Sequence, residues 1–247
     1  MFCTNLILQS SYYMRFIFLI ATLLILNSCS SPTYNRSSPF FKGTFLKVEK
    51  IIEITACNPK DPKHCITKKY GSSASSFIVA HKEKYSYLLT SGHVCEINFG
   101  RLTQLPGFRA DIQFYGITLK NKKHNFEIVS LDKESDLCLL RTTRVDLPAY
   151  RISNNPPKLG DPAYNIASPI GIFGEDMVPL FAGIYSGDAY GRSIFSIPAI
   201  GGSSGSPVLN KRGEVIGVIS ATTTDFKHLV VCSPLKAIKE IINNGLQ

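Results

Sequence analysis

Three short segments of this 247-residue chain carry a base, an acid and a hydroxyl, the side-chain types that nucleophilic catalysis needs. His93 follows the apolar run 87–89, which places an imidazole at the end of a strand. Asp136 directly precedes the apolar run 137–140, where a partly buried carboxylate must find a partner. Ser204 stands in a tight glycine-serine loop. Taken singly, each has an ordinary explanation as a structural histidine, a turn-capping aspartate or a flexible turn.

The three residues are more informative together. They occur in the order His, Asp, Ser, separated by 43 and 68 residues, and each adjoins an apolar strand that could fix it rigidly. Their surroundings read Thr-Ser-Gly-His at 90–93, Ser-Asp-Leu-Cys-Leu-Leu at 135–140 and Gly-Gly-Ser-Ser-Gly-Ser-Pro at 201–207. In these motifs the chain resembles the trypsin-like, double β-barrel serine peptidases. It is most similar to their bacterial branch, which includes the high-temperature-requirement proteases and the glutamyl endopeptidases. The resemblance extends over residues 44–243.

The resemblance implies a role for each residue. Ser204 would attack the carbonyl carbon of the scissile bond, His93 would take the hydroxyl proton and pass it to the leaving amine, and Asp136 would hold the imidazole. The backbone N–H groups of Gly202 and Ser204 would form the oxyanion hole. The predicted activity is that of a serine endopeptidase that acts on a protein or peptide substrate through an acyl-enzyme.

The expected nucleophile differs from its neighbours in its flanking residues. Ser204, unlike Ser203 and Ser206, has Gly two residues before it, Gly directly after it and Pro three residues after it. The animal trypsin-like enzymes carry an Asp at the position of Ser203, which pairs with a newly freed N-terminus. Activation by that route is therefore not expected for this chain.

The resemblance also transfers a specificity pocket onto uncharged positions. Trypsins place an Asp at the position of Pro198 to bind Arg or Lys, and glutamyl endopeptidases place a His at the position of Ile219. Because a buried charge without a partner is costly, small or medium apolar side chains are the predicted substrates. The transferred pocket positions are Pro198, Ala199, Ile200, Ser220, Ala221 and Thr222.

The elements that must position these residues are short β-branched and aromatic runs separated by turn residues. A dozen such runs predict an all-β chain of two six-stranded antiparallel β-barrels, about 44–147 and 148–233, with a linker at 146–160. A C-terminal α-helix is predicted at about 234–244, with Ser233 as its N-cap. The predicted strands are 45–54, 76–80, 85–90, 110–119, 126–131, 137–142, 163–167, 181–186, 193–197, 207–210, 215–220 and 228–232.

The N-terminal segment predicts export. Met14 is the expected true start, and the uncharged apolar run 16–26 matches the core of a signal peptide but is short for a membrane span. Leu26-Asn27-Ser28-Cys29 resembles the lipobox of bacterial lipoproteins, in which Cys29 would be lipidated. Residues 1–28 are then the signal peptide and 29–43 a flexible tether to the peptidase domain at 44–247. The alternatives are a plain secretory signal or an uncleaved anchor. The predicted location is the cell envelope, anchored in a membrane on its periplasmic or extracellular face.

Cysteine usage agrees with an oxidising location. Cys57 and Cys65 flank a turn-rich insert that a disulfide would close into a hairpin loop. A metal site there is poorly supported, because one His between two Cys lacks paired ligand spacing. In the fold that the resemblance implies, Cys95 and Cys138 lie close to the triad, either as a disulfide or as two buried reduced thiols.

Composition excludes disordered, collagen-like and coiled-coil chains, since 44% of residues are hydrophobic and 18% charged. The net charge of +9 is scattered along the chain. The one local cluster, Lys120, Lys122 and Lys123, favours a solvated turn over a nucleic-acid or glycan site. No nucleic-acid partner is therefore expected. No cofactor or metal is expected either. The main alternative function is that of an inactive peptidase homologue acting as a surface binding module.

Overall fold

The computed structural model describes residues 44–175, 177–223 and 226–247. The predicted signal peptide, the tether and Cys29 lie outside the described residues. The all-β class is confirmed, and each of the dozen predicted runs overlaps an observed strand. Along the described ranges, no helix is both long and apolar enough to cross a membrane.

The first sheet is antiparallel, with the strand order β5-β4-β1-β2-β3-β7-β6. It has seven described strands rather than the predicted six and does not close into a barrel. The additional strand is the three-residue β5, which is too short and polar to leave a pattern in the sequence. The strands are β1 (Phe45–Asn58), β2 (Asp61–Lys82), β3 (Tyr85–Ser91), β4 (Arg109–Ile117), β5 (Lys123–Asn125), β6 (Glu127–Asp132) and β7 (Leu137–Thr143).

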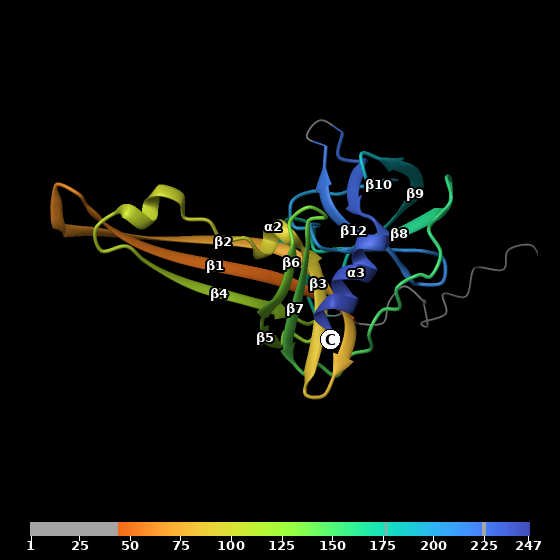
Figure 1. Ribbon diagram of the computed structural model, residues 1–247, viewed down its shortest axis with the longest axis horizontal. Coiled ribbons are helices and arrows are strands. Elements are labelled where there is room, and N and C mark those ends of the chain that lie inside the picture. Colours follow the sequence, from red (N-terminus) through yellow and green to blue (C-terminus); the bar gives the residue numbers. More distant parts are fainter. Residues whose placement is uncertain (1–43, 176, 224–225) are drawn as a thin grey trace, which may run out of the picture. The chain divides into compact units, whose positions relative to one another are not determined.

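Strand β2 is much longer than the predicted run 76–80, and β1 extends beyond the predicted run 45–54 to Asn58. They pair from Phe45↔Phe77 out to Cys57↔Cys65 and, with β4, extend as an arm beyond the rest of the sheet (Figure 1). The predicted disulfide between Cys57 and Cys65 is confirmed near the tip of this arm. The 3₁₀ helix η1 (Gly100–Gln104) precedes β4.

The second sheet is the closed six-stranded barrel β10-β13-β12-β11-β8-β9. The 3₁₀ helix η2 (Pro169–Gly171) lies between its first two strands. The strands are β8 (Pro162–Ile166), β9 (Leu180–Ala189), β10 (Arg192–Ser196), β11 (Pro207–Leu209), β12 (Val215–Thr222) and β13 (Val230–Ser233).

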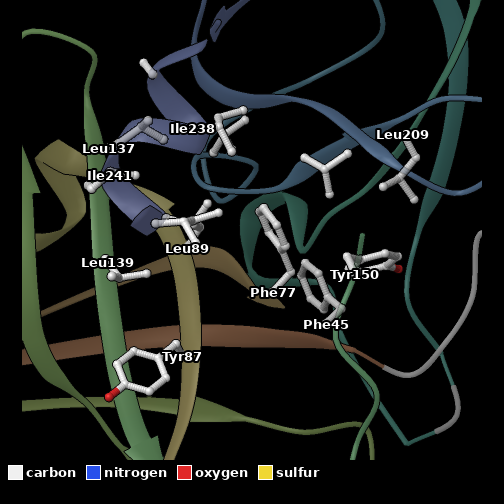
Figure 2. Close-up of a cluster of buried hydrophobic side chains, with 14 of the residues drawn as sticks. Phe45, Phe77, Tyr87, Leu89, Leu137, Leu139, Tyr150, Leu209, Ile238 and Ile241 are labelled. Atoms are coloured by element: carbon white, nitrogen blue, oxygen red, sulfur yellow. The ribbon is translucent and has the colours of Figure 1, made fainter. Parts of the chain in front are cut away.

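One buried cluster joins the first sheet, the second barrel and the C-terminal helix α3 (Leu235–Gly245). Phe77 and Leu89 come from the sheet, Leu209 from the barrel and Ile238 from α3, and all four are fully buried (Figure 2). Burial of such side chains stabilises the fold by about 1.5–3 kcal/mol each. Because Leu89 lies near the end of β3, the same packing fixes the strand that leads into His93.

The start of α3 differs from the sequence expectation. Pro234 is the N-cap residue, and no side chain caps the helix. Ser233 is therefore not the N-cap, because its hydroxyl donates a 2.7 Å hydrogen bond to the carbonyl oxygen of Ser135 in the first sheet. The local sequence pattern predicts that this hydroxyl caps the helix, but it bonds instead to a residue distant in the sequence.

Candidate active site

His93 lies directly after β3, in the short helix α2 (Gly92–Cys95). The two residues that end β3 hold this strand in place. Ser91 Oγ donates to the carbonyl of Ile219 on β12 at 2.6 Å, and Thr90 Oγ1 donates to the carbonyl of Ser75 on β2 at 2.8 Å. The His93 side chain is 49% exposed. A fixed backbone thus presents an imidazole that a substrate can reach.

Asp136 meets His93 through three contacts. The His93 Nδ1 atom lies 3.0 Å from Oδ2 and 3.1 Å from Oδ1, and the His93 backbone N–H donates to Oδ1 at 2.7 Å. Gly92 lets the carboxylate approach, because a Cβ at this position would lie 3.0 Å from Oδ1. The predicted acid and base are therefore brought together, and the imidazole is held by one of its two nitrogens.

Several groups act on the charge of Asp136. Its partial burial alone would raise its pKa. Hydrogen bonds from the His93 ring and backbone, the charge of His93 and a hydrogen bond from the Ser220 hydroxyl all lower the pKa, and together they outweigh burial. The net pKa lies below the ordinary value of an aspartate. Asp136 is therefore ionised at neutral pH, as a group that stabilises an imidazolium must be.

A disulfide links the segments that carry the base and the acid. Cys95 lies two residues after His93, Cys138 two residues after Asp136, and the two sulfurs are bonded. This confirms the disulfide and excludes the pair of reduced thiols. The bond fixes α2 to β7, and both cysteines are buried in one hydrophobic cluster of the first sheet.

Lys50 of β1 is a further support of α2. Its Nζ donates to the carbonyls of Val94 at 2.6 Å and Glu96 at 3.1 Å, on either side of the helix end. Burial lowers the pKa of this ammonium, while the charge of Glu96 opposes that shift. The carbonyl groups that the four-residue helix leaves unpaired thereby gain a charged donor.

The loop of Ser204 depends on two glycines with left-handed backbones. Gly202 has φ +95°, and a Cβ there would lie 2.4 Å from the carbonyl oxygen of Ser168. Gly205 has φ +82°, and a Cβ there would lie 2.2 Å from the carbonyl oxygen of Ser75. Neither position accepts a side chain without movement of the backbone. The glycines on both sides of Ser204 therefore bring its loop into close contact with the neighbouring chain.

The backbone of Ser204 is held by the residues that also hold β3. The N–H of Ser75 donates to the carbonyl of Ser204 at 2.8 Å, and the N–H of Gly205 donates to the carbonyl of Ile219 at 2.8 Å. Ser75 and Ile219 thus contact both the loop of Ser204 and the strand before His93. Within the described residues, no hydrogen bond joins the Ser204 hydroxyl to His93.

The peptide groups before Ser204 have fixed orientations. The carbonyl of Gly201 accepts from the Ile170 N–H at 2.6 Å, and the carbonyl of Gly202 accepts from Ser75 Oγ at 2.8 Å. Ser203 N–H donates to the carbonyl of Ile200 at 2.9 Å. Along the described chain, the N–H groups of Gly202 and Ser204 have no backbone acceptor. Two donors on one turn are therefore available to an oxygen of a substrate.

Comparison with known protein families identifies the family of this chain. Residues 74–218 match the model of the family described as "Trypsin-like peptidase domain". The chain belongs to this family. The matched region holds His93, Asp136 and Ser204, and the predicted peptidase class is confirmed at the level of the family.

Three curated relatives of this trypsin-like domain carry the name "Probable periplasmic serine endoprotease DegP-like". That of Hahella chejuensis is 28% identical over 186 residues, covering 70% of this chain and 35% of its own. Those of Pseudomonas fulva and Marinomonas sp. are 30% and 31% identical, each covering 62% of this chain and 30% of its own. The chain thus spans about a third of the length of these relatives.

A solved structure shows the same fold. It is the "Crystal structure of the serine endoprotease from Yersinia pestis", with a TM-score of 0.56 and 19% sequence identity, covering 78% of this chain and 61% of that one. The predicted trypsin-like architecture is therefore confirmed at the level of the fold.

The six predicted pocket positions of the trypsin-like domain lie on two segments that contact the same turn. Ala199 N–H donates to the carbonyl of Lys227 at 2.9 Å, and Thr222 Oγ1 donates to the carbonyl of Leu229 at 3.2 Å. Pro198 and Ile200 flank Ala199, and Ile200 is 37% exposed. Ala221 is exposed and continues β12 after Ser220.

Ser220 has a contact beyond its predicted place in the pocket. Its hydroxyl is one of the groups that lower the pKa of Asp136, and it lies 3.2 Å from Ser233 Oγ. No sequence pattern indicated this contact or those of Ser75, Lys50 and Ser233. Single serines and lysines carry no local signal of contacts that form across 15 to 127 residues of chain.

Proposed function

We propose that this chain is a serine endopeptidase that hydrolyses peptide bonds through an acyl-enzyme in the cell envelope. The observation that supports this most directly is the contact of His93 Nδ1 with both carboxylate oxygens of Asp136. It leaves Nε2 as the nitrogen available to a nucleophile, and it supplies an ionised acid where an imidazolium would form. The nucleophile loop is fixed to the same two backbone segments.

Acylation would proceed in two proton transfers. Ser204 Oγ attacks the carbonyl carbon of the substrate while its proton moves to His93 Nε2, which forms a tetrahedral intermediate and an imidazolium beside Asp136. The carbon–nitrogen bond then breaks as the imidazolium gives that proton to the leaving amine. In deacylation, the same imidazole takes a proton from a water molecule as the water oxygen attacks the ester carbon. The bond from that carbon to Ser204 Oγ then breaks, and the imidazolium returns the proton to Oγ as the acid product leaves.

The oxyanion of the intermediate would bind to the N–H groups of Gly202 and Ser204. The hydrogen bond that the Gly201 carbonyl accepts from the Ile170 N–H supports this assignment, because it fixes the peptide group to which the Gly202 N–H belongs. Removal of one such donor typically costs about 2.7–4 kcal/mol of transition-state stabilisation. The backbone of this loop therefore contributes to the reaction as much as a side chain would.

A location in the cell envelope is supported by three observations. The described residues contain two disulfides, the apolar run 16–26 precedes Cys29, and the relatives carry the word periplasmic in their names. We propose that Cys29 is lipidated and that residues 29–43 tether the peptidase domain to a membrane. One acyl chain holds a protein only marginally, so stable anchoring requires the several chains that lipoprotein processing attaches.

Labelling by a fluorophosphonate tests the proposed activity. The wild-type protein should react, and peptide mapping should place the adduct on Ser204. Ser204→Ala should abolish labelling and peptide hydrolysis, with a loss of roughly four to six orders of magnitude in kcat. Ser206→Ala is the matched control, because Ser206 is fully buried and its Oγ accepts a 2.7 Å bond from Asn165. A folded wild-type protein that neither reacts nor hydrolyses peptides would instead be a binding module.

A further inference from the structure

Arg192 reaches from the second barrel to the turn that carries Asp136. It is the first residue of β10, and its guanidinium donates from Nη1 to the carbonyl of Ser135 at 2.6 Å and from Nη2 to the carbonyl of Glu134. These are the two peptide groups directly before Asp136. No other guanidinium in the described residues contacts a backbone segment next to the triad.

We propose that Arg192 is a positioning residue for Asp136: its two hydrogen bonds fix the peptide groups 134–136 and thereby hold the carboxylate on His93. The proposal rests on the proposed function for its effect on hydrolysis. Arg192 does not touch the reacting atoms, and it acts only through the turn.

The backbone of Asp136 explains why this turn needs support. Asp136 has φ +52°, a left-handed conformation that residues other than glycine rarely adopt. Such a conformation persists only where the surrounding contacts determine it. On its own sheet the turn has the bond from Ser135 N–H to Asp132 Oδ1, at 3.0 Å. Among the described residues, the hydrogen bonds that the Glu134 and Ser135 carbonyls accept come from the second barrel.

The second barrel supplies those bonds from two strands. Ser233 Oγ on β13 donates to the Ser135 carbonyl at 2.7 Å, beside the Arg192 bond to the same oxygen. Arg192 directly follows the turn of the β9–β10 hairpin. The two turn residues, Tyr190 and Gly191, have left-handed backbones with φ +53° and +72°. Rotation of the 135–136 peptide would swing the carboxylate, so removal of the guanidinium is expected to loosen the contact with His93.

A guanidinium suits this task better than an ammonium. It presents parallel N–H groups in a rigid plane, and here they bond to two successive carbonyls. A lysine at the same position could keep the charge and one bond, but it could not hold both peptide groups in one orientation. The kcat of Arg192→Lys should therefore lie between that of the wild type and that of a variant without a donor at residue 192.

The experiment compares Arg192→Met and Arg192→Lys with the control Arg212→Met. Arg212 is a second arginine of the same barrel, but its guanidinium is exposed and pairs with Glu214. In steady-state hydrolysis, Arg192→Met should lower kcat by up to about 100-fold with little change in KM, because a misplacement of about 1 Å has that effect on chemistry. Arg192→Lys should lose less, and Arg212→Met should match the wild type. Added guanidinium, below denaturing concentrations, should restore part of kcat in Arg192→Met only.

A measurement without turnover separates this proposal from the proposed function. The low-field proton NMR signal of the His93 imidazole N–H, assigned by its loss in His93→Ala, reports the bond to Asp136. It should be present in the wild type and Arg212→Met and lost or broadened in Arg192→Met. If Arg192→Met loses this signal but the wild type does not hydrolyse peptides, the proposed function fails and the positioning role stands. If Arg192→Met does not fold, Arg192→Lys decides by the same signal. Folded Arg192 variants with wild-type kcat and an unchanged signal would overturn the proposal.

Discussion

The N–H of Ser75 donates a 2.8 Å hydrogen bond to the carbonyl oxygen of Ser204, and this bond attaches the nucleophile loop of the second barrel to β2 of the first sheet. The carbonyl of Ser75 in turn accepts from Thr90 Oγ1, three residues before His93. One residue thus connects the segments that carry His93 and Ser204. The candidate site is therefore a product of how the two sheets meet, and changes at that junction should affect activity first.

Gly205→Ala tests this junction. A Cβ at Gly205 would lie 2.2 Å from the Ser75 carbonyl oxygen, and the left-handed φ disfavours any side chain. Strain and overpacking together should lower the free energy of unfolding by about 3 kcal/mol and abolish hydrolysis. Urea unfolding and peptide hydrolysis measure the two effects. Gly71→Ala is the control, because nothing lies within 4 Å of its Cβ, and it should retain both properties. Full activity in Gly205→Ala would contradict the observed packing.

The two disulfides should differ in what they control. The Cys95–Cys138 bond closes a loop of 43 residues, which predicts a stabilisation of about 4 kcal/mol on the loop-entropy estimate. Because it joins the segments of His93 and Asp136, its replacement by two alanines should lower kcat as well as stability. The Cys57–Cys65 bond closes only 8 residues, for which the same estimate gives about 2.5 kcal/mol.

The alanine pair at 57 and 65 is therefore the matched control for the alanine pair at 95 and 138. It lies near the tip of the arm and should lower the melting temperature while leaving kcat at the wild-type level. Thermal unfolding and steady-state hydrolysis of both double variants give the comparison. Equal losses of kcat in the two variants would show that the Cys95–Cys138 bond has no particular connection to the triad.

Asp136 makes stability depend on pH in acid. Its pKa is lowered in the folded protein, so its contribution is complete above the ordinary aspartate pKa of about 3.9 and is lost as pH falls through the lower folded value. Urea unfolding between pH 5 and pH 2 should show a steeper loss of stability in the wild type than in Asp136→Asn. Asp111→Asn, at an exposed position on β4, should keep the wild-type slope. The same slope in Asp136→Asn as in the wild type would show that the lowered pKa is absent in solution.

Whether a feature of the fold or of the candidate site can be predicted from the sequence depends on how far apart in the sequence the interacting residues lie. The strands around the triad follow from apolar runs such as 137–140, because burial of a strand leaves a local pattern. The outer half of β2 does not follow, because residues such as Lys68 and Lys69 carry no apolar pattern although their backbones pair with β1. Their side chains are exposed, and the exposed surface leaves no alternation to read.

The residues that support the site lie beyond the reach of local patterns for a related reason. Arg192 and Ser233 bond to backbone carbonyl groups, which every residue has. No sequence pattern can therefore predict which residue is their partner. Ser233 shows the consequence: its position before a helix predicts an N-cap, but a carbonyl 98 residues away takes its hydroxyl. Short motifs locate a reacting group, whereas the contacts that orient it require the fold.

The predicted lipid anchor is tested at Cys29. Cys29→Ser should shift the protein from the membrane fraction to the soluble fraction, because no lipid could then be attached. Mass spectrometry of the wild-type N-terminus should find a lipidated cysteine at residue 29 as the first residue. Cys232→Ser serves as a control, since Cys232 is a fully buried thiol that takes no part in targeting. An unmodified N-terminus at another residue would refute the anchor and favour a plain secretory signal.

The last prediction concerns which substrate side chain lies before the cut. The predicted pocket positions carry no charge, and Thr222 is tied by its hydroxyl to the Leu229 carbonyl. A buried charged substrate would lose its hydration without gaining a partner, which disfavours Arg, Lys and Glu. Cleavage of a peptide library should therefore occur mainly after small or medium apolar residues, with only about 1–3 kcal/mol of discrimination among neighbouring aliphatics. Pro198→Asp should raise cleavage after Arg and Lys by supplying the missing charge. Dominant cleavage after Arg, Lys or Glu in the wild type would show that other residues build the pocket, and an unchanged profile in Pro198→Asp would show that Pro198 does not face it.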